Sequence, residues 1–325
     1  MQCGAPVIGS SLSSIPEVIG RADALFDPHS VPDMTRLLKR ALEDGAFLAD
    51  LRDHAVKQAA QFSWERTARE TITAVEAAHA ARGEQPPLAQ IVDQHRSEAV
   101  IPLIAQVEPA VPPTPDDLEA TVMAMTANEA TARAVRNRAR EGEAVAWRLE
   151  GPFDSSYSLA LVNRETARAL AALGHAPALH SAEGGGDFDP DPAFLSANPD
   201  LATHHKASQS LPPASAAIVS RNLFPPRIAD MTGPVNALHG YAWEEAGFPQ
   251  AWADDFNRHL DLILVTSEHV EKILIDNGVH VPIAVTGNGV DHWDRIAPSP
   301  AYRLSARGFR FLHVSSCFPR KGADD

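Results

Sequence analysis

The chain contains very little cysteine. Its two cysteines, Cys3 and Cys317, stand far apart, and neither belongs to a Cys-x-x-Cys pair. A disulfide framework or a structural zinc site needs several cysteine or histidine ligands at short spacing. The sequence therefore predicts neither a disulfide scaffold nor a metal site, and it fits a reducing compartment such as the cytoplasm.

The chain also lacks an excess of positive charge. It has 28 basic and 42 acidic residues, and its formal net charge is −14. A protein that binds nucleic acid needs a basic face to neutralise phosphates. The one short basic patch, between Arg133 and Arg140, is too small to supply it, so we expect no nucleic-acid partner. Local phosphate binding stays open, because a pocket needs only one or two cations and some backbone N–H groups.

No apolar run is long enough to span a bilayer, and the first residues do not show the basic-then-apolar order of a secretory signal. We therefore expect a cytoplasmic protein, with peripheral contact at the inner face of the membrane left open. The sequence also lacks a Gly-x-Gly-x-x-Gly turn followed by a ribose-binding acid, and it has no Walker loop. Those absences count against an unrelated Rossmann-type nucleotide enzyme.

Strand and helix patterns alternate from residue 145 onward. Helices are indicated at 158–174, after Ser158, and at 267–278, between the N-cap Ser267 and Gly278. The predicted strands read VAWRLEG, APALHSAE, AAIVSRN, PVNALHGY, DLILVTS and PIAVTGNGVD. This alternation predicts an α/β fold in which a parallel sheet carries helices on both faces. Ligands bind such sheets at the carboxyl ends of the strands.

Residues 1–82 contain fewer strand signals. A short strand is predicted at Pro6–Gly9, and a helix is predicted from the N-cap Ser30 to Gly45 with an apolar face running from Met34 to Leu42. Two more helices are indicated, one over 47–60 and one from Ser63 to about Ala81. One strand and three helices are too few to build a covered sheet. Residues 83–144 are Pro-rich at first and polar afterwards, which predicts a linker followed by a polar helix.

Several residues are candidates for binding or catalysis because they follow predicted strands. Gly151 and Pro152 begin the loop after the first strand, where a glycine allows either a close ligand or close packing of the backbone. His239 and Glu244 lie in a segment that would overhang the carboxyl edge, and a structural role in a solvated loop is the alternative for both.

Two further motifs stand near the end of the chain. Asn288 and Gly289 lie in the turn TGNGVD, which is typical of a hinge. Arg320, Lys321 and Gly322 follow a predicted strand and precede an expected helix N-terminus. Cations next to the positive end of a helix suit a diphosphate, above all one that leaves with developing negative charge. A solvent-facing basic turn is the alternative.

These segments together resemble the GT-B glycosyltransferases of family 4, the retaining and metal-independent group. The resemblance rests on VSRNLFPPRIADM, LHGYAWEEAGFP and GNGVDHW in one half, on FLHVSSCFPRKG at the end, and on CGAPVIGSS and FSWERTA at the start. It implies that 145–308 form an acceptor-side Rossmann-like lobe and that 309–325 open the nucleotide-sugar lobe. Residues 1–82 then resemble the closing part of another nucleotide-sugar lobe. A tandem protein is the favoured interpretation, and a circular permutation is the less favoured one.

The resemblance implies transfer of a sugar from a nucleoside diphosphate to a glycan or lipid-linked acceptor in surface polysaccharide biosynthesis. It implies no cofactor and no metal, since the nucleotide sugar is the donor substrate. His239 and Glu244 become the catalytic candidates, Arg320, Lys321 and Gly322 the diphosphate site, and Gly151 and Pro152 the acceptor or phosphate loop. Because the ribose-binding glutamate and the remainder of the tandem enzyme are missing, we expect little activity from this chain alone. A non-catalytic scaffold derived from a glycosyltransferase is the alternative.

Overall fold

A six-stranded, fully parallel sheet organises residues 144–183 and 185–297. The structure is a computed structural model and describes these residues together with 1–82. The strand order is β10-β9-β8-β7-β3-β4, and every neighbouring pair in it runs parallel. The strands are β3 (Ala146–Glu150), β4 (Ala176–His180), β7 (Ile218–Arg221), β8 (Asn236–Tyr241), β9 (Leu262–Val265) and β10 (Ile283–Val285). The predicted α/β class with a parallel sheet is confirmed.

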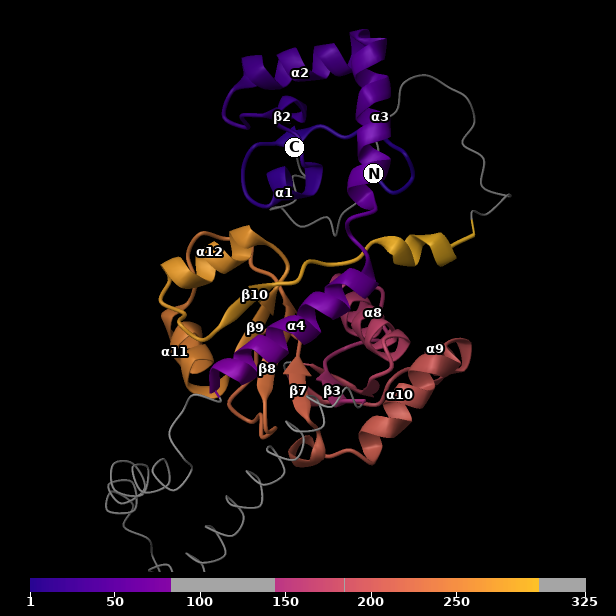
Figure 1. The fold of residues 1–325 in the computed structure, drawn as a ribbon, viewed down its shortest axis with the longest axis vertical. Helices are drawn as coiled ribbons and strands as arrows, with labels where there is room; N and C mark the ends of the chain where they lie inside the picture. The colour runs from indigo at the N-terminus through magenta and orange to yellow at the C-terminus, as the bar shows by residue number, and fades with distance from the viewer. Residues whose placement is uncertain (83–143, 184, 298–325) are drawn as a thin grey trace, which may run out of the picture. The chain divides into compact units, whose positions relative to one another are not determined.

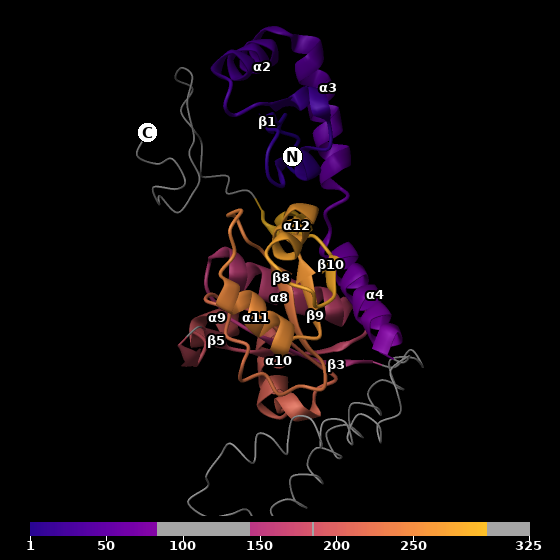
Figure 2. The same ribbon diagram turned by 90° about the vertical axis from the view of Figure 1, so that its left-hand side faces the viewer.

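Helices cover both faces of this sheet, as Figures 1 and 2 show. Strand residues alternate between the faces, so Trp147 and Leu149 of β3 pack with α8 and α4, whereas Val219 and Leu238 pack with α11 and α12 on the opposite face. The helices that follow the sheet strands are α8 (Ser158–Ala172), α9 (Pro192–Ala197), α10 (Pro199–Gln209), α11 (Gln250–His259) and α12 (Glu268–Asp276). Short 3-10 turns are η3 (Pro213–Ser215) and η4 (Asp291–Arg295).

The N-caps of this region were predicted with mixed success. The Ser267 side chain accepts a hydrogen bond from the Val270 N–H and caps α12 as expected. Ser158 was expected to cap α8, but Tyr157 occupies that position and gives no side-chain cap bond, so Ser158 is the first helical residue.

Helices α9, α10 and α11 had no counterpart in the sequence prediction. The segment predicted as one strand from Ala176 to Glu183 divides into β4 and a small antiparallel hairpin, β5 (Ala182–Glu183) with β6 (Gly186–Asp187).

The first 60 residues form a segment with its own apolar cluster, in which Ile19, Leu37, Phe47 and Leu51 are buried. Its elements are β1 (Gly9–Ser10), α1 (Ile15–Ile19), η1 (Ala22–Ala24), β2 (Leu25–Phe26), α2 (Val31–Glu43) and α3 (Gly45–Ala59). The two short strands pair in parallel, so a two-residue ladder replaces the strand predicted at Pro6–Gly9.

Two details of helix α2 correct the sequence prediction. Ser30 caps its start as expected, because its side chain accepts from the Asp33 N–H. Gly45 does not close the helix. Asp44 ends α2 and caps α3 by accepting from the Phe47 N–H, so Gly45 is the first residue of the next helix. The predicted apolar face is only partly buried, since Leu37 is buried whereas Leu38 and Leu42 are 52% and 71% exposed.

Helix α4 (Trp64–Arg82) joins the first segment of the chain to the sheet. Ser63 caps it, as predicted, by accepting from the Arg66 N–H. Trp64 and Ala68 of α4 lie in the apolar cluster of β3 and α8, and Ala74 and Val75 pack against the cluster of β8 and β9. The described residues from Met1 to Trp293 accordingly belong to one compact unit. The predicted linker and polar helix over 83–144 lie outside the described residues, apart from Ala144, and so does the predicted strand at 309–314.

Candidate functional site

The loop after β3 is shaped by the close approach of neighbouring atoms to Gly151. This glycine has φ +153°, and its N–H donates to the His180 carbonyl at the end of β4. A Cβ at this position would lie 2.3 Å from both Asn163 Nδ2 and the carbonyl oxygen of Asn222. Atoms of the chain itself therefore explain why glycine is needed here, whether or not a ligand also approaches.

Asn163 connects this loop with His239. Its Nδ2 donates to the carbonyls of Pro152 (2.7 Å) and Asn222 (3.0 Å), and its Oδ1 lies 2.9 Å from His239 Nε2. Because Oδ1 can only accept a hydrogen bond, Nε2 must be the donor. The network thereby assigns the proton of the neutral imidazole to Nε2 and leaves a lone pair on Nδ1.

Three polar side-chain atoms near this point have no hydrogen-bond partner among the described residues. They are His239 Nδ1, Asn222 Nδ2 and Asn288 Oδ1. The last two lie 3.6 and 3.8 Å from the position of the Cβ that Gly240 lacks, and His239 precedes Gly240 in β8. Since buried polar groups usually have partners, each of these atoms is a candidate contact for a hydroxyl or a water. We call His239, Asn222 and Asn288 the Gly240 polar cluster.

Burial determines the charge state of His239. The residue is 2% exposed, and desolvation lowers its pKa to about 3. Its imidazole is therefore neutral throughout the physiological range, in agreement with the tautomer that Asn163 imposes. A neutral, buried Nδ1 is an acceptor for a hydroxyl group and no binding site for an anion.

Acid is expected to destabilise the fold through His239. The folded pKa of about 3 lies below the ordinary value of 6.5, so the unfolded chain takes up the proton first as the pH falls. This contribution to stability is complete above about pH 6.5 and is lost toward pH 3, at up to about 1.4 kcal/mol per pH unit. Urea unfolding measured between about pH 7 and 5 should give a shallower slope for His239→Gln than for the wild type. Burial also lowers the pKa of His175, His180 and His204, but these act equally in both proteins. Equal slopes would contradict the assignment.

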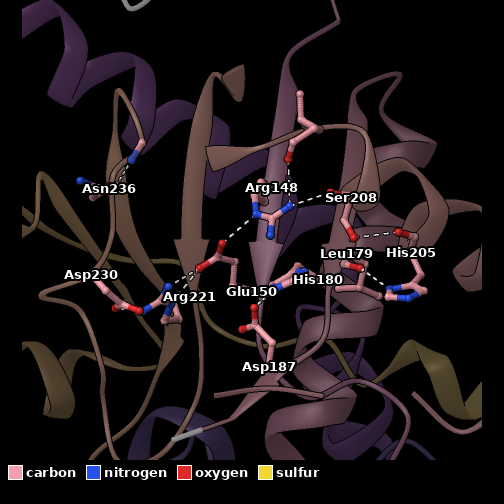
Figure 3. Close-up of polar contacts among 12 residues, drawn as sticks. Arg148, Glu150, Leu179, His180, Asp187, His205, Ser208, Arg221, Asp230 and Asn236 are labelled. Atoms are coloured by element: carbon pink, nitrogen blue, oxygen red, sulfur yellow. Dashed lines mark hydrogen bonds and ion pairs between the residues drawn. The ribbon is translucent and has the colours of Figure 1, made fainter. Parts of the chain in front are cut away.

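Figure 3 shows a second polar network, an ion network around Arg148 and Glu150 of β3. Glu150 is 3% exposed and accepts from Arg148 Nε (2.7 Å) and from Arg221 Nε (2.9 Å). Arg148 Nη1 also donates to the carbonyls of Ser208 and Leu211, both at 2.8 Å. Arg221 Nη1 donates to the Asp230 carboxylate at 2.6 Å. Parallel register places Glu150 beside Arg221 on β7 and beside His180 on β4.

This network was not predicted from the sequence. The available signal was the pair of charged residues at alternate positions of β3, Arg148 and Glu150, together with Arg221 at the end of β7. Strands of a parallel sheet are usually apolar on both faces, so charge at these positions was the unusual feature. Which charges meet depends on strand register, and register does not follow from one strand alone.

The structure brings together four of the predicted site residues. Gly151, Pro152 and His239 are linked through Asn163, and Asn288 joins them at Gly240. Glu244 lies on the exposed loop after β8. Arg320, Lys321 and Gly322 lie outside the described residues, so the diphosphate site stays a prediction.

The predicted hinge at Asn288 and Gly289 is anchored to the start of α4. The Val290 N–H donates to the Phe62 carbonyl (2.8 Å), and the Asp291 carboxylate accepts from the Trp64 N–H (2.8 Å). A Cβ on Gly289 would lie 2.2 Å from Trp64 N. Glycine is thus required by contact here, and the hinge role stays a prediction.

Part of the chain is similar to known enzymes. Over 72 residues it is 50% identical to the serotype-specific mannosyltransferase WbdA of Escherichia coli, covering 22% of this chain and 9% of that protein. It is 36% identical over 74 residues to O-antigen chain mannosyltransferase B of Escherichia coli, covering 23% of this chain and 19% of the relative. These relatives are glycosyltransferases. A D-inositol 3-phosphate glycosyltransferase of Nocardioides sp. is 38% identical over 71 residues, covering 21% of this chain and 16% of the relative.

These similarities support a glycosyltransferase function for the chain. The aligned part spans less than a fifth of each relative's length. No protein-family profile matches the chain, and no solved structure matches it. Within 1–82, 144–183 and 185–297, no three His, Cys, Asp or Glu residues are grouped as metal ligands. In the same part of the chain, no helix is long and apolar enough to cross a membrane.

Proposed function

We propose that this chain carries the acceptor-side lobe of a retaining GT-B glycosyltransferase of family 4. The enzyme would transfer a sugar from a nucleoside diphosphate to a glycan or lipid-linked acceptor in surface polysaccharide biosynthesis. The 50% identity over 72 residues to a mannosyltransferase carries the transferase class, and the assignment of the lobe rests on the parallel sheet and the motifs of residues 145–308. The parallel sheet supports it, because the Gly240 polar cluster lies where such sheets bind ligands, at the carboxyl ends of the strands.

In this proposal an acceptor or donor sugar hydroxyl lies at the Gly240 polar cluster. His239 Nδ1 accepts the hydroxyl hydrogen, and Asn222 Nδ2 donates to its oxygen. A base with a pKa of about 3 removes protons poorly near neutral pH. His239 therefore orients the hydroxyl by hydrogen bonding, and Asn163 holds the imidazole in the required tautomer. Glu244 is the second catalytic candidate, a carboxylate on the exposed loop after β8.

The donor diphosphate would be held by Arg320, Lys321 and Gly322. Positive charge at the leaving group stabilises the transition state, and removing one such preorganised contact typically costs about 3–4 kcal/mol. No metal ion or organic cofactor is part of the proposal. We expect little or no turnover from the 325-residue chain by itself, because retaining transfer needs a preorganised site around the nucleotide and the sugar as well as a diphosphate contact.

Sugar binding at His239 is the test. Saturation-transfer NMR would measure how the chain binds mannose-terminated oligosaccharides and nucleotide sugars, and a radiolabel assay would follow transfer. His239→Gln keeps a donor for Asn163 but removes the Nδ1 acceptor, so binding should weaken up to about tenfold, the effect of one lost hydrogen bond. His29→Ala, at an exposed position, is the control and should bind as the wild type does. If no sugar or nucleotide sugar binds, the non-catalytic scaffold becomes the better interpretation.

A further inference from the structure

A pocket of about 550 Å³ lies over the β3–β4 side of the sheet. It occupies the face to which Arg148 and Glu150 point, beyond Val219, where the apolar cluster under α11 and α12 ends. The volume falls within the range of about 300–1,000 Å³ that is typical of small-ligand sites. No role for this part of the fold was predicted from the sequence.

The pocket contains a buried polar atom that lacks a partner. Ser181 is 1% exposed and lines the pocket, and its Oγ has no hydrogen-bond partner among the described residues. His205 also lines the pocket, and it donates from Nδ1 to the Leu179 carbonyl at 3.1 Å, which leaves Nε2 as its second polar atom (Figure 3). A buried hydroxyl without a partner is costly, so its presence in a pocket wall indicates that a ligand or water completes it.

The charges of the pocket do not suit an anion. Its one guanidinium, Arg148, is already bonded to Glu150 and to two backbone carbonyls. Asp187 and Asp189 add two carboxylates to the lining, and Asp187 lies 3.1 Å from His180 Nε2. A phosphate or carboxylate ligand would be repelled by these acids, and Glu150 offsets the charge of Arg148. The lining therefore favours a neutral ligand with many hydroxyl groups.

The remaining wall supplies apolar surface. Phe188, Pro212 and Pro213 line the pocket beside the polar residues. Apolar surface combined with a few placed hydrogen-bonding groups is the usual composition of a small-molecule site, and it matches a sugar ring, which has C–H faces and a hydroxyl rim. His180 also joins the pocket to the carboxyl edge, because its carbonyl accepts from the Gly151 N–H at 3.0 Å.

We propose that this pocket binds a neutral oligosaccharide, namely a part of the glycan acceptor that continues beyond the reacting sugar. The inference rests on the proposed function and assigns the class of acceptor. The pocket binds a carbohydrate chain and does not bind a phosphate-bearing lipid head group. The loop at Gly151 would hold the reacting end, and the pocket would hold the following sugars.

The experiment is a titration of the 325-residue chain with mannotriose, maltotriose and inorganic phosphate, followed by NMR or calorimetry. Gln209 lines the pocket at an exposed position of α10, so Gln209→Trp should block it without disturbing the core. Gln250→Trp, at an exposed position of α11, is the matched control. We expect at least one trisaccharide to bind, with affinity at least tenfold weaker in Gln209→Trp and Phe188→Ala and unchanged in Gln250→Trp.

Each other outcome overturns the proposal. Trisaccharide binding that is insensitive to Gln209→Trp but sensitive to His239→Gln would exclude the pocket as the glycan site and leave the proposed function intact. Phosphate binding that competes with the trisaccharide would show an anion site instead. If neither trisaccharide binds at millimolar concentration, the pocket is not a glycan site, and sugar or nucleotide-sugar binding at His239 then decides the proposed function independently.

Discussion

Replacing Glu150 by glutamine is expected to lower the free energy of unfolding by about 3–5 kcal/mol, the typical cost of removing one partner from a buried ion pair. The substitution keeps the size of the side chain but removes the charge. It leaves the guanidinium groups of Arg148 and Arg221 buried, 5% and 4% exposed, without the carboxylate that both contact. Guanidinium groups cannot lose their charge in compensation. Urea unfolding followed by circular dichroism measures the loss.

The control for this experiment is an exposed ion pair of the same chain. Arg258 lies 3.5 Å from Asp255, and the two side chains are 67% and 45% exposed. Asp255→Asn should cost no more than about 1 kcal/mol, because solvent screens surface pairs. A loss below about 1 kcal/mol for Glu150→Gln as well would show that water reaches the network. Replacing both arginines by apolar residues should not restore full stability, since Ser208, Leu211 and Arg227 would lose donors to their carbonyls.

Gly151→Ala is expected to be the second severe substitution. Its φ of +153° is costly for alanine, at about 1–3 kcal/mol. The new Cβ would also lie 2.3 Å from Asn163 Nδ2 and from the Asn222 carbonyl, and such overpacking adds about 1–3 kcal/mol. Unfolding free energies measure the sum. The displaced Asn163 should also change the hydrogen bond to His239, which the ¹⁵N shifts of the imidazole report.

Gly174→Ala separates the two causes. Gly174 has φ +88°, but an added Cβ would have no atom within 4 Å in the described part of the chain. This variant should therefore show backbone strain alone and leave the His239 shifts unchanged. If Gly151→Ala were no worse than Gly174→Ala, the close approach of Asn163 and Asn222 would not be decisive for this loop.

Local sequence signals predicted those helices and strands that interactions between neighbouring residues determine. Ser30, Ser63 and Ser267 cap helices because a hydroxyl next to a free N–H group acts within three residues. Apolar β-branched runs predicted β7 and β9 for a similarly local reason. Gly45 was wrongly predicted to end a helix. The prediction relied on the glycine alone and did not consider that the Asp44 side chain caps the next helix.

Helix α10 shows where local signals were insufficient. Its sequence PDLATHHKASQ buries only Leu201 and Ser208, so it has too weak an apolar period to be recognised. Leu38 and Leu42 show the reverse case, since their spacing predicts burial but the described part of the chain leaves them exposed. The burial of a helix face depends on which other element packs against it, and the sequence of the helix does not identify that element.

The sequence by itself determined the α/β class, the parallel order of alternating elements and the candidates His239, Gly151 and Asn288. Short-range physics is enough for these, because hydrophobic period, caps and glycine turns act over a few residues. Only the tertiary structure decided that Asn163 fixes the tautomer of His239, that Glu150 binds Arg148 and Arg221, and that Ser181 lines a pocket with His205. Strand register and helix packing bring these groups together from up to 76 residues apart, and such long-range pairings depend on all the elements at once.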